Sequence, residues 1–319
     1  MTAEFDVSQS AGTPHVTILM ATYEGAVWLP EQLQSFTDQT HKNWQLLASD
    51  DGSADGTQDL LAAFYETHRG QLLPGPQEGS TANFKSLLLR AGDHMPSGGW
   101  LAFADQDDKW LPDRLSRGVA ALTDVPEDQP ALFCSRTWVV DEALENRRLS
   151  APRPKPPAFR NALVQNIAAG NTILVNSAGA RLLCAAAGDA EAFVVHDWWA
   201  YQMITGAGGL VLHEDEPTLL YRQHGNNAIG ANLGYWAQLV RLWALLRGDL
   251  HAWSAVNVPV LQASSHRFTP ENKTALALFS EMHSGRFLRR LQAFFRLRPY
   301  RQSRSGTCAI WIATLLKRV

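Results

Sequence analysis

The chain has 319 residues, of which 45% are hydrophobic and 18% charged. These fractions are those of an ordinary folded protein, and the length allows one large domain or two modest ones. The three cysteines are widely spaced and odd in number, which argues against a disulfide framework or a thiolate zinc site. The N-terminal segment does not resemble a secretory signal, and no apolar run approaches the roughly 20 residues of a membrane-spanning helix. We therefore expect a cytoplasmic protein.

The net charge of −3 hides a strong asymmetry along the chain. Nine of the 28 Lys and Arg residues, and no Asp or Glu, lie between Arg286 and Val319. The rest of the chain carries 19 basic and 31 acidic side chains, a net charge of −12. A nucleic-acid-binding protein would spread basic charge over its binding face, so we expect no nucleic-acid partner. The pattern instead suggests an acidic body with a basic tail that meets an anionic surface.

The first hundred residues alternate between apolar runs and helix-like stretches. Val16–Thr22 has the continuous apolar and β-branched pattern of a strand that is buried on both faces. The other expected strands are Trp44–Ser49, Gln71–Leu73 and Trp100–Ala104, and the expected helices are 28–39, 58–69 and 83–91. Such alternation predicts an α/β fold with a doubly wound, mostly parallel sheet that is flanked by helices and joined by right-handed crossovers.

Beyond residue 122 the pattern changes. A strand is expected over Ala131–Val140, and a loop or lid over the proline-rich segment Pro152–Pro157. Shorter strands are expected at Ile173–Val175 and Thr218–Tyr221. From residue 233 onward the apolar residues follow helical spacing, as in Leu233, Trp236, Leu239, Val240, Trp243 and Leu246. We therefore expect an α/β domain over residues 1–230 and a helical C-terminal region over residues 231–319.

Three acidic side chains lie within four residues at Asp105, Asp107 and Asp108, between the expected strand Trp100–Ala104 and a helix-like stretch from Trp110. Such side chains repel one another unless a cation lies among them, and Mg²⁺ and Mn²⁺ prefer carboxylate oxygens. Open α/β sheets also bind ligands at the carboxyl ends of their strands. The alternative is a solvated turn that leads to a helix cap.

Two other polar segments follow strands at the same expected edge. Asp50 and Asp51 end the second strand, where a carboxylate can accept hydrogen bonds from a ribose hydroxyl or a base N–H. The alternative is a helix cap built with Asp55 or Thr57. The segment Thr22-Tyr23-Glu24 follows the first strand and can bracket a base, although an aromatic residue after a strand usually packs inward. The convergence of three polar segments favours a metal and nucleotide site.

Two later motifs carry further candidates. In His196-Asp197-Trp198-Trp199, Asp197 can act as a general base whose pKa is raised by desolvation, and the tryptophans can form a platform for a sugar. The alternative is a helix start with buried tryptophans. In the segment 221–227, His224 is a candidate metal ligand and Arg222 can balance phosphate charge, the alternative for His224 being an exposed loop residue.

Several well-known motifs are missing from the chain. It has no H-E-x-x-H, G-x-G-x-x-G, G-x-x-x-x-G-K-[ST] or G-x-S-x-G sequence. This disfavours histidine-based metallohydrolases, nicotinamide dehydrogenases, P-loop NTPases and hydrolases with a nucleophile elbow.

The assembled motifs resemble those of the family 2 glycosyltransferases, which have the GT-A fold. The segments that carry the resemblance are Val16–Glu24, Asp50–Thr57, Ala104–Leu111, His196–Trp199 and Tyr221–Asn227. The forms FADQDDKWLPDRL, HDWWA and YRQHGNN look most like bacterial members of the rhamnosyltransferase type. The resemblance covers about residues 14–230.

The resemblance implies an inverting, metal-dependent transfer of a sugar in cell-surface polysaccharide assembly. The donor would be dTDP-rhamnose or a UDP-sugar, the acceptor a free or lipid-linked saccharide, and the cofactor Mg²⁺ or Mn²⁺. Asp197 would be the catalytic base, with Asp107 and His224 as metal ligands. The implied nucleotide-sugar contacts are Thr22, Tyr23, Glu24, Asp50, Asp51, Asn83, Asp105, Asp108 and Arg222, and the implied acceptor contacts are Trp198 and Trp199. Glu24 is a departure, because many members carry asparagine there.

The tail has two interpretations. Phe287, Leu288, Leu291, Phe294 and Phe295 fall on one side of an expected helix, and Arg289, Arg290 and Arg296 fall on the other. This predicts an interfacial helix and a peripheral location at the inner face of the plasma membrane. The alternative is a helix that packs on the body, with its arginines paired to the acidic surface.

Two other functions remain open at this point. A nucleotidyltransferase would share the carboxylate–metal arrangement, but it usually needs a glycine-rich basic loop, and the segment Ala21–Leu29 contains neither Lys nor Arg. A non-catalytic nucleotide-sugar-binding module would not need Asp197. The sequence leaves the donor, the acceptor and the oligomeric state undetermined.

Overall fold

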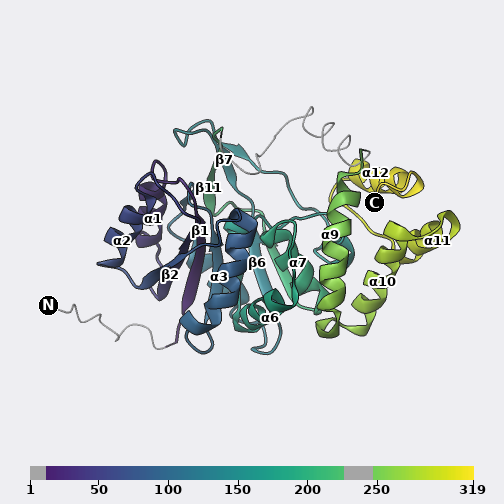
Figure 1. Ribbon diagram of the computed structural model, residues 1–319, viewed down its shortest axis with the longest axis horizontal. Helices are drawn as coiled ribbons and strands as arrows, with labels where there is room; N and C mark the ends of the chain where they lie inside the picture. Colours follow the sequence, from purple (N-terminus) through teal and green to yellow (C-terminus); the bar gives the residue numbers. More distant parts are fainter. Residues whose placement is uncertain (1–11, 226–246) are drawn as a thin grey trace.

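The computed structural model of the chain describes residues 12–225 and 247–319. The expected positions of Asn226 and Asn227, and the helical spacing from Leu233 to Leu246, lie outside the described residues. Within the described ranges, the protein contains a large sheet between two layers of helices, with further helices at the C-terminal end (Figure 1).

The large sheet has seven strands in the order β10-β6-β9-β4-β1-β2-β3. The short strand β9 runs antiparallel to both of its neighbours, and all other pairs are parallel. Their bounds are β1 Val16–Thr22, β2 Trp44–Asp50, β3 Gly70–Pro74, β4 Trp100–Ala104, β6 Ala131–Ser135, β9 Leu174–Val175 and β10 Leu210–Glu214. The predicted mostly parallel α/β sheet is therefore confirmed.

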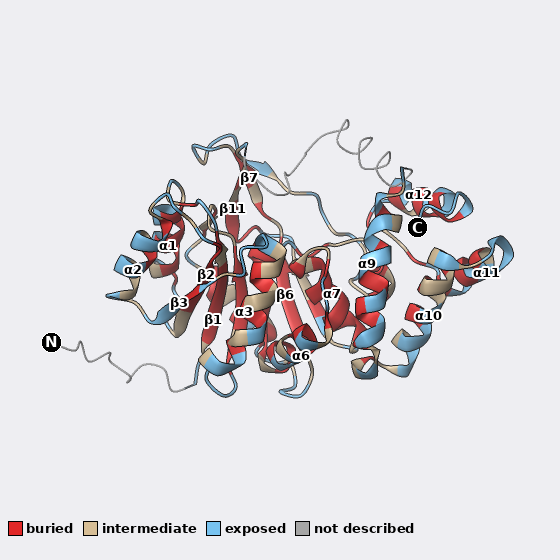
Figure 2. Ribbon diagram, in the orientation of Figure 1, coloured by how far each residue is buried: buried red, intermediate tan, exposed pale blue. Residues whose placement is uncertain are grey.

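Alternate residues of the central strands point into two separate hydrophobic clusters. On one face, Leu19, Leu47 and Phe103 pack with residues of three helices: α3 Ser80–His94, α6 Ser177–Asp189 and α7 His196–Gly206. On the other face, Ile18 and Met20 pack with α1 Leu29–Thr37, α2 Thr57–Tyr65 and α4 Arg114–Leu122. Burial on both faces explains the continuous apolar pattern of these strands (Figure 2).

A second sheet of four short strands has the order β5-β11-β7-β8. Its strands are β5 Lys109–Trp110, β7 Trp138–Val140, β8 Arg148–Leu149 and β11 Leu219–Arg222. The single strand predicted over Ala131–Val140 is wrong, because the chain leaves the large sheet after β6 and enters the small one as β7. Arg136 and Thr137 form the corner, where Thr137 N donates to the Ser150 hydroxyl instead of continuing the ladder.

The C-terminal region is helical over its described residues, 247–319, as predicted. Its described helices are α9 Asp249–Ala263, α10 Pro270–Ser284, α11 Phe287–Leu297 and α12 Arg304–Leu315, with the short helix η2 Ser265–Arg267 between α9 and α10. Two further short helices, α5 Phe159–Ala162 and η1 Gly170–Thr172, lie in the α/β body. Leu250, Leu261 and Phe279 belong to the same hydrophobic cluster as the buried residues of α7. The helical region therefore shares a core with the α/β body. None of the helices in the described ranges is both long and apolar enough to cross a membrane.

The prediction of which side chains lie on the apolar and charged sides of the tail helix is partly wrong. Arg290 was expected on the outer, charged side but is buried, and its guanidinium donates to the carbonyl oxygens of Gly285, Thr314 and Leu315. Phe294 is also buried. Arg290 therefore satisfies carbonyl groups at the end of α12, which otherwise have no partner within the helix.

Candidate active site

The polar segments after β1, β2 and β4 meet at the carboxyl ends of the strands, as the sequence predicts. The backbone N–H and C=O of Tyr23 bond to the side-chain amide of Gln106, each at 2.9 Å. Glu24 accepts from Ala54 N at 2.8 Å, and its own backbone N–H donates to the Ser53 hydroxyl at 2.9 Å. The loop after β1 is therefore fixed to the loops after both of its neighbouring strands.

The two carboxylates that end β2 organise two different loops. Asp50 accepts hydrogen bonds from the hydroxyls of Thr22 and Ser53 and from the amide of Gln58, at 2.6–2.8 Å. Burial alone would raise the pKa of Asp50, but these bonds outweigh it and lower the pKa. Asp51 accepts from Gln77 N and Gly79 N at 2.7 and 2.8 Å, and so fixes the turn before α3.

Glu24 has a left-handed backbone conformation, with φ at +47°. Asparagine adopts this conformation more readily than glutamate does. In this chain the bonds to Ser53 and Ala54 hold the glutamate in place.

The acidic cluster after β4 is divided among three environments. Asp108 is fully buried and accepts from the Asn171 amide at 2.6 Å and from Arg222 N at 3.2 Å. Asp107 Oδ2 lies 2.8 Å from His224 Nε2, so the structure brings together the two predicted metal ligands. Burial, with the charges of Asp107 and Asp197 nearby, raises the pKa of Asp105 to about 8. Burial also raises the pKa of Asp108.

A buried cation, which the sequence analysis missed, lies against this cluster. Arg114 of α4 is 2% exposed, stacks on the Trp110 ring at 3.4 Å and donates to the carbonyl oxygens of Asn171, Phe103 and Ile173. Burial lowers its pKa to about 9, against the opposing influence of Asp108 and Asp105. In the sequence, Arg114 is a single arginine nine residues after Asp105. Nothing in this spacing indicated that its side chain lies beside the acidic cluster.

Asp197 is placed by the first turn of α7. Its Oδ2 accepts from Gly170 N at 3.0 Å, and its other oxygen accepts from Trp198 N. A Cβ on Gly170 would lie 2.7 Å from His196 Nε2 and 3.3 Å from the Asp197 Cβ, so this close approach requires glycine. Burial raises the pKa of Asp197 to about 6, although its hydrogen bonds act in the opposite direction. This pKa suits a base that works near neutral pH.

The predicted acceptor platform of Trp198 and Trp199 is wrong for this structure. Their side chains are 5% and 1% exposed, so neither offers a face to a sugar. The Trp198 indole N–H donates to Ala162 O at 2.6 Å, and Trp199 stacks on Phe193. Both residues instead anchor the helix that carries Asp197, as in the alternative interpretation of the motif.

Two predicted nucleotide contacts also have internal roles. Asn83 is 1% exposed and donates to Ser49 O at 2.7 Å, which places it behind β2 rather than at the edge. Arg222 is 2% exposed, and its guanidinium bonds to the carbonyl oxygens of Asp107 and Glu142 and to the Glu31 carboxylate. It therefore joins α1 to the acidic cluster, and the prediction that it meets phosphate is not supported.

Trp28, at the start of α1, was also missed by the sequence analysis. Its ring stacks on His224 with centroids 5.4 Å apart, and the Arg222 guanidinium lies 4.6 Å from the ring centroid. The indole thus helps to hold His224 beside Asp107. By contrast, Tyr23 is 60% exposed at the same edge, so its ring can stack on a base.

Asp107 and His224 suit a divalent cation in their chemistry, because a carboxylate oxygen and an imidazole nitrogen both bind Mn²⁺. The described residues contain no group of three or more His, Cys, Asp and Glu side chains arranged for a cation. A divalent cation held by Asp107 and His224 would take further ligands from a bound diphosphate and water, which is common for such ions.

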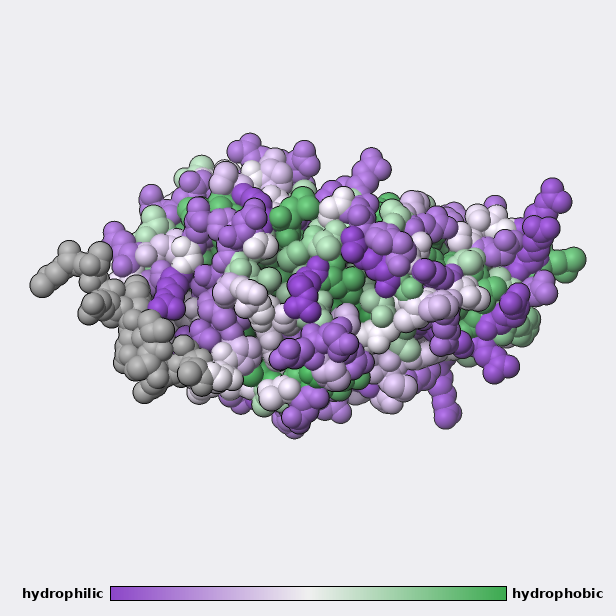
Figure 3. Space-filling view, turned by 90° about the horizontal axis from the view of Figure 1, so that it is seen from below, coloured by the Kyte–Doolittle hydropathy of each residue, from purple (hydrophilic) through white to green (hydrophobic). Residues whose placement is uncertain are grey.

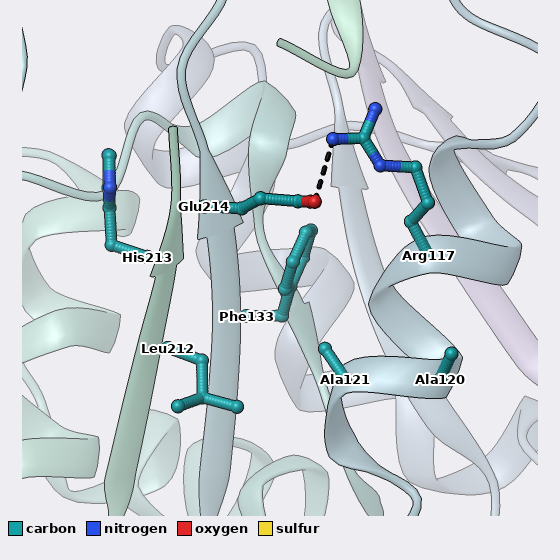
Figure 4. Close-up of a pocket in the computed structure, with 7 residues that line it drawn as sticks. All are labelled: Arg117, Ala120, Ala121, Phe133, Leu212, His213 and Glu214. Carbon is teal, nitrogen blue, oxygen red and sulfur yellow. Dashed lines mark ion pairs between the residues drawn. The ribbon is translucent and has the colours of Figure 1, made fainter. Parts of the chain in front are cut away.

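A separate cavity of about 400 Å³ lies between α4 and the strands β6 and β10 (Figure 4). Phe133 and Leu212 line it, and Arg117 pairs with Glu214 at 2.8 Å beside it. None of the residues predicted for the site lines this cavity.

A family model, "Glycosyl transferase family 2", matches residues 17–184, which is more than half of the chain. The chain belongs to this family. It is therefore an enzyme that transfers a sugar from a nucleotide sugar. The matched region contains the three converging strand ends described above, whereas Asp197 and His224 lie beyond it.

Curated relatives agree with this assignment. The chain is 26% identical to a dTDP-rhamnosyl transferase, RfbG, of Shigella flexneri over 70% of its own length and 78% of that protein. It is 29% identical to an Escherichia coli protein named UDP-Glc:alpha-D-GlcNAc-diphosphoundecaprenol beta-1,3-glucosyltransferase, over 34% of its own length and 40% of that protein.

Solved structures show the same GT-A fold. The Staphylococcus aureus protein TarS, residues 1–349, in complex with UDP-GlcNAc aligns with a TM-score of 0.55 and 13% identity, over 95% of this chain and 89% of that one. GalNAc-T7 with UDP, GalNAc and Mn²⁺ aligns with a TM-score of 0.51 and 10% identity, over 76% of this chain and 52% of that one. The predicted GT-A fold is thereby confirmed.

Replacing Arg114 with methionine should destabilise the protein by about 3–5 kcal/mol, because Asp105 and Asp108 would lose the nearby cation and three buried carbonyl groups would lose their donor. Urea unfolding of the Arg114→Met variant measures this loss. The control is Arg181→Met at an exposed position of α6, which should change stability by no more than about 0.5 kcal/mol. Equal stability of the two variants would contradict the role given to Arg114.

Proposed function

We propose that this family 2 enzyme transfers rhamnose from dTDP-rhamnose, with inversion, to a saccharide acceptor in cell-surface polysaccharide assembly. The rhamnosyl donor is supported by the 26% identity to RfbG, which extends over most of both chains. A UDP-sugar is the alternative donor. The diphosphoundecaprenol in the name of the second relative supports a lipid-linked acceptor and hence a peripheral location at the inner face of the plasma membrane.

The observation that carries the mechanism is the placement of Asp197. Its carboxylate is close enough to Asp105 to raise the pKa of that residue, and Asp105 is two residues from Asp107. A carboxyl group whose pKa burial raises to about 6 therefore lies near Asp105, beside the edge where the strand ends meet. An acceptor hydroxyl is a weak nucleophile until a base removes its proton. Asp197 would accept this proton while the hydroxyl attacks the anomeric carbon from the side opposite the diphosphate.

The residues around Asp197 prepare it for this role. Gly170 N and Trp198 N orient its carboxylate oxygens, and the buried tryptophans fix the first turn of α7. Asp107 and His224 would hold Mg²⁺ or Mn²⁺, which when bound neutralises charge on the departing diphosphate. Tyr23 would stack on the base, beside the loops that Thr22, Glu24, Asp50 and Asp51 fix.

Asp197→Asn should lower rhamnosyl transfer at least about 100-fold, because the amide cannot accept the proton. The affinity for the donor nucleotide should stay nearly unchanged. Radiolabelled transfer and calorimetric titration with dTDP measure the two quantities, with the exposed Asp93→Asn as the matched control. Wild-type turnover in Asp197→Asn would rule out the assignment of the base.

In the wild type, the rate of transfer should rise as the pH increases through about 6, because the ionised form of Asp197 is active and burial raises its pKa to that value.

Chelation with EDTA should abolish transfer, and Mn²⁺ or Mg²⁺ should restore it. Asp107→Asn and His224→Ala should each raise the metal concentration needed for half-maximal dTDP binding about tenfold or more, since each removes one of two protein ligands. His266→Ala is the control, because this histidine is 60% exposed and lies far along the chain in η2. A metal requirement that is identical in all four proteins would contradict the proposed ligands.

A further inference from the structure

The helices α11 and α12 expose large apolar side chains at the C-terminal end of the molecule. Their exposed fractions range from 38% for Trp311 to 78% for Leu288. The set consists of Phe287, Leu288 and Phe295 from α11 and Trp311, Ile312, Leu315 and Leu316 from α12 and its cap, and is called the apolar hairpin face below. Figure 3 shows hydrophobic side chains among strongly hydrophilic ones at this end of the molecule.

The two helices form one surface rather than two. The rings of Phe295 and Trp311 are in edge contact with centroids 4.8 Å apart, and the rings of Phe294 and Trp311 are in edge contact with centroids 4.6 Å apart. Arg290 donates to Thr314 O at 2.7 Å and to Leu315 O at 3.3 Å, which joins the middle of α11 to the end of α12. The buried residues of both helices thus fix their outer faces side by side.

The hairpin is also firmly attached to the body of the enzyme. Lys155 bonds to Arg301 O through its ammonium group and to the Gln302 amide through its backbone N–H and C=O. Asn161 donates to Tyr300 O at 2.9 Å. A surface mounted in this way would hold the whole catalytic domain in a defined orientation on whatever it contacts.

The charge around the apolar hairpin face identifies the partner. Residues 286–319 contain nine Lys and Arg and no Asp or Glu, while the rest of the chain has a net charge of −12. Exposed basic residues flank the face at Arg289, Arg296, Arg304, Lys317 and Arg318. Apolar side chains that insert between lipids, bordered by basic side chains that meet anionic headgroups, are the features of an interfacial helix. Contiguous apolar surface of this kind is rare on a soluble monomer without a binding role.

We infer that the apolar hairpin face docks the enzyme on an anionic lipid bilayer, with Leu288, Phe295, Trp311, Ile312, Leu315 and Leu316 inserted among the lipids. This surface differs from the one expected from the sequence, because Arg290 and Phe294 are buried and because α12 and its cap supply four of the six side chains named. The inference rests on the proposed function only for its purpose, which is to bring the site to a lipid-linked acceptor.

The test is flotation of the full-length protein with vesicles of phosphatidylcholine alone or with added phosphatidylglycerol, without any nucleotide sugar. The wild type should float with the anionic vesicles, less at high salt, and hardly with the neutral ones. Leu288→Gln/Leu316→Gln and Arg289→Gln/Arg296→Gln should each lower partitioning about tenfold or more. The matched controls are Leu89→Gln/Val256→Gln, at exposed apolar positions elsewhere, and Arg147→Gln/Arg148→Gln, at exposed basic ones.

The controls should float like the wild type, and all five proteins should hydrolyse or transfer from a nucleotide sugar equally with a soluble acceptor. This second readout separates failure of the docking surface from failure of the proposed reaction. Equal flotation of the wild type and both hairpin variants would overturn the inference. So would a dimer in sedimentation that the Leu288→Gln/Leu316→Gln variant dissociates while none of the proteins binds vesicles, because the face would then join two copies of the chain.

Discussion

The site depends on how the fold separates three carboxylates that are adjacent in the sequence. Asp105, Asp107 and Asp108 would repel one another in any arrangement that left them equivalent. The structure gives each a different set of partners: Asp108 is enclosed with Asn171, Asp107 faces His224, and Asp105 lies near Asp197. The positive charge of the buried Arg114 guanidinium offsets the negative charges of Asp105 and Asp108. One short loop thereby supplies a structural anchor, a candidate metal ligand and a carboxyl group whose pKa is raised.

The loops around the cluster are also held by hydrogen bonds to carboxylates. Asp50 and Asp51 accept hydrogen bonds from the loops that follow β2 and β3, and Glu24 joins the loop after β1 to the loop after β2. Such bonds reduce the conformational freedom that a bound nucleotide would otherwise have to remove. These bonds, all within the protein, organise the edge, and the Tyr23 ring remains exposed there.

The sequence predicted the features that depend on local pattern. The strand Trp100–Ala104 has the expected bounds, and the three polar segments meet because carboxyl ends of parallel strands share an edge. Features that depend on long-range contacts were missed. Trp198 is buried against α5 and α9, and Trp199 is buried against Phe193; no sequence pattern distinguishes such buried tryptophans from an exposed platform. The role of Arg114 depends on Asn171, 57 residues away, and the two-residue strand β9 is too short to show a periodicity.

In the C-terminal region, too, the sequence pattern did not reveal a feature that depends on long-range contacts. Its helical character and basic charge were evident from the sequence, but the orientation of α11 was not, because a buried arginine looks like a surface residue until its carbonyl partners are known. Arg290 bonds to carbonyls that lie 24 and 25 residues further along the chain. That contact decides which face of the helix is left for a partner, and it explains how two short helices present one continuous apolar surface.

The central claim is that a base on α7 and a departing diphosphate act on opposite sides of the sugar. The most direct measurement is the anomeric configuration of the product, determined by nuclear magnetic resonance after transfer from dTDP-rhamnose of known configuration. We expect a rhamnosyl product whose anomeric configuration is inverted relative to the donor. A product that retains the donor configuration would contradict direct displacement assisted by Asp197, and with it the arrangement of the site proposed for this enzyme.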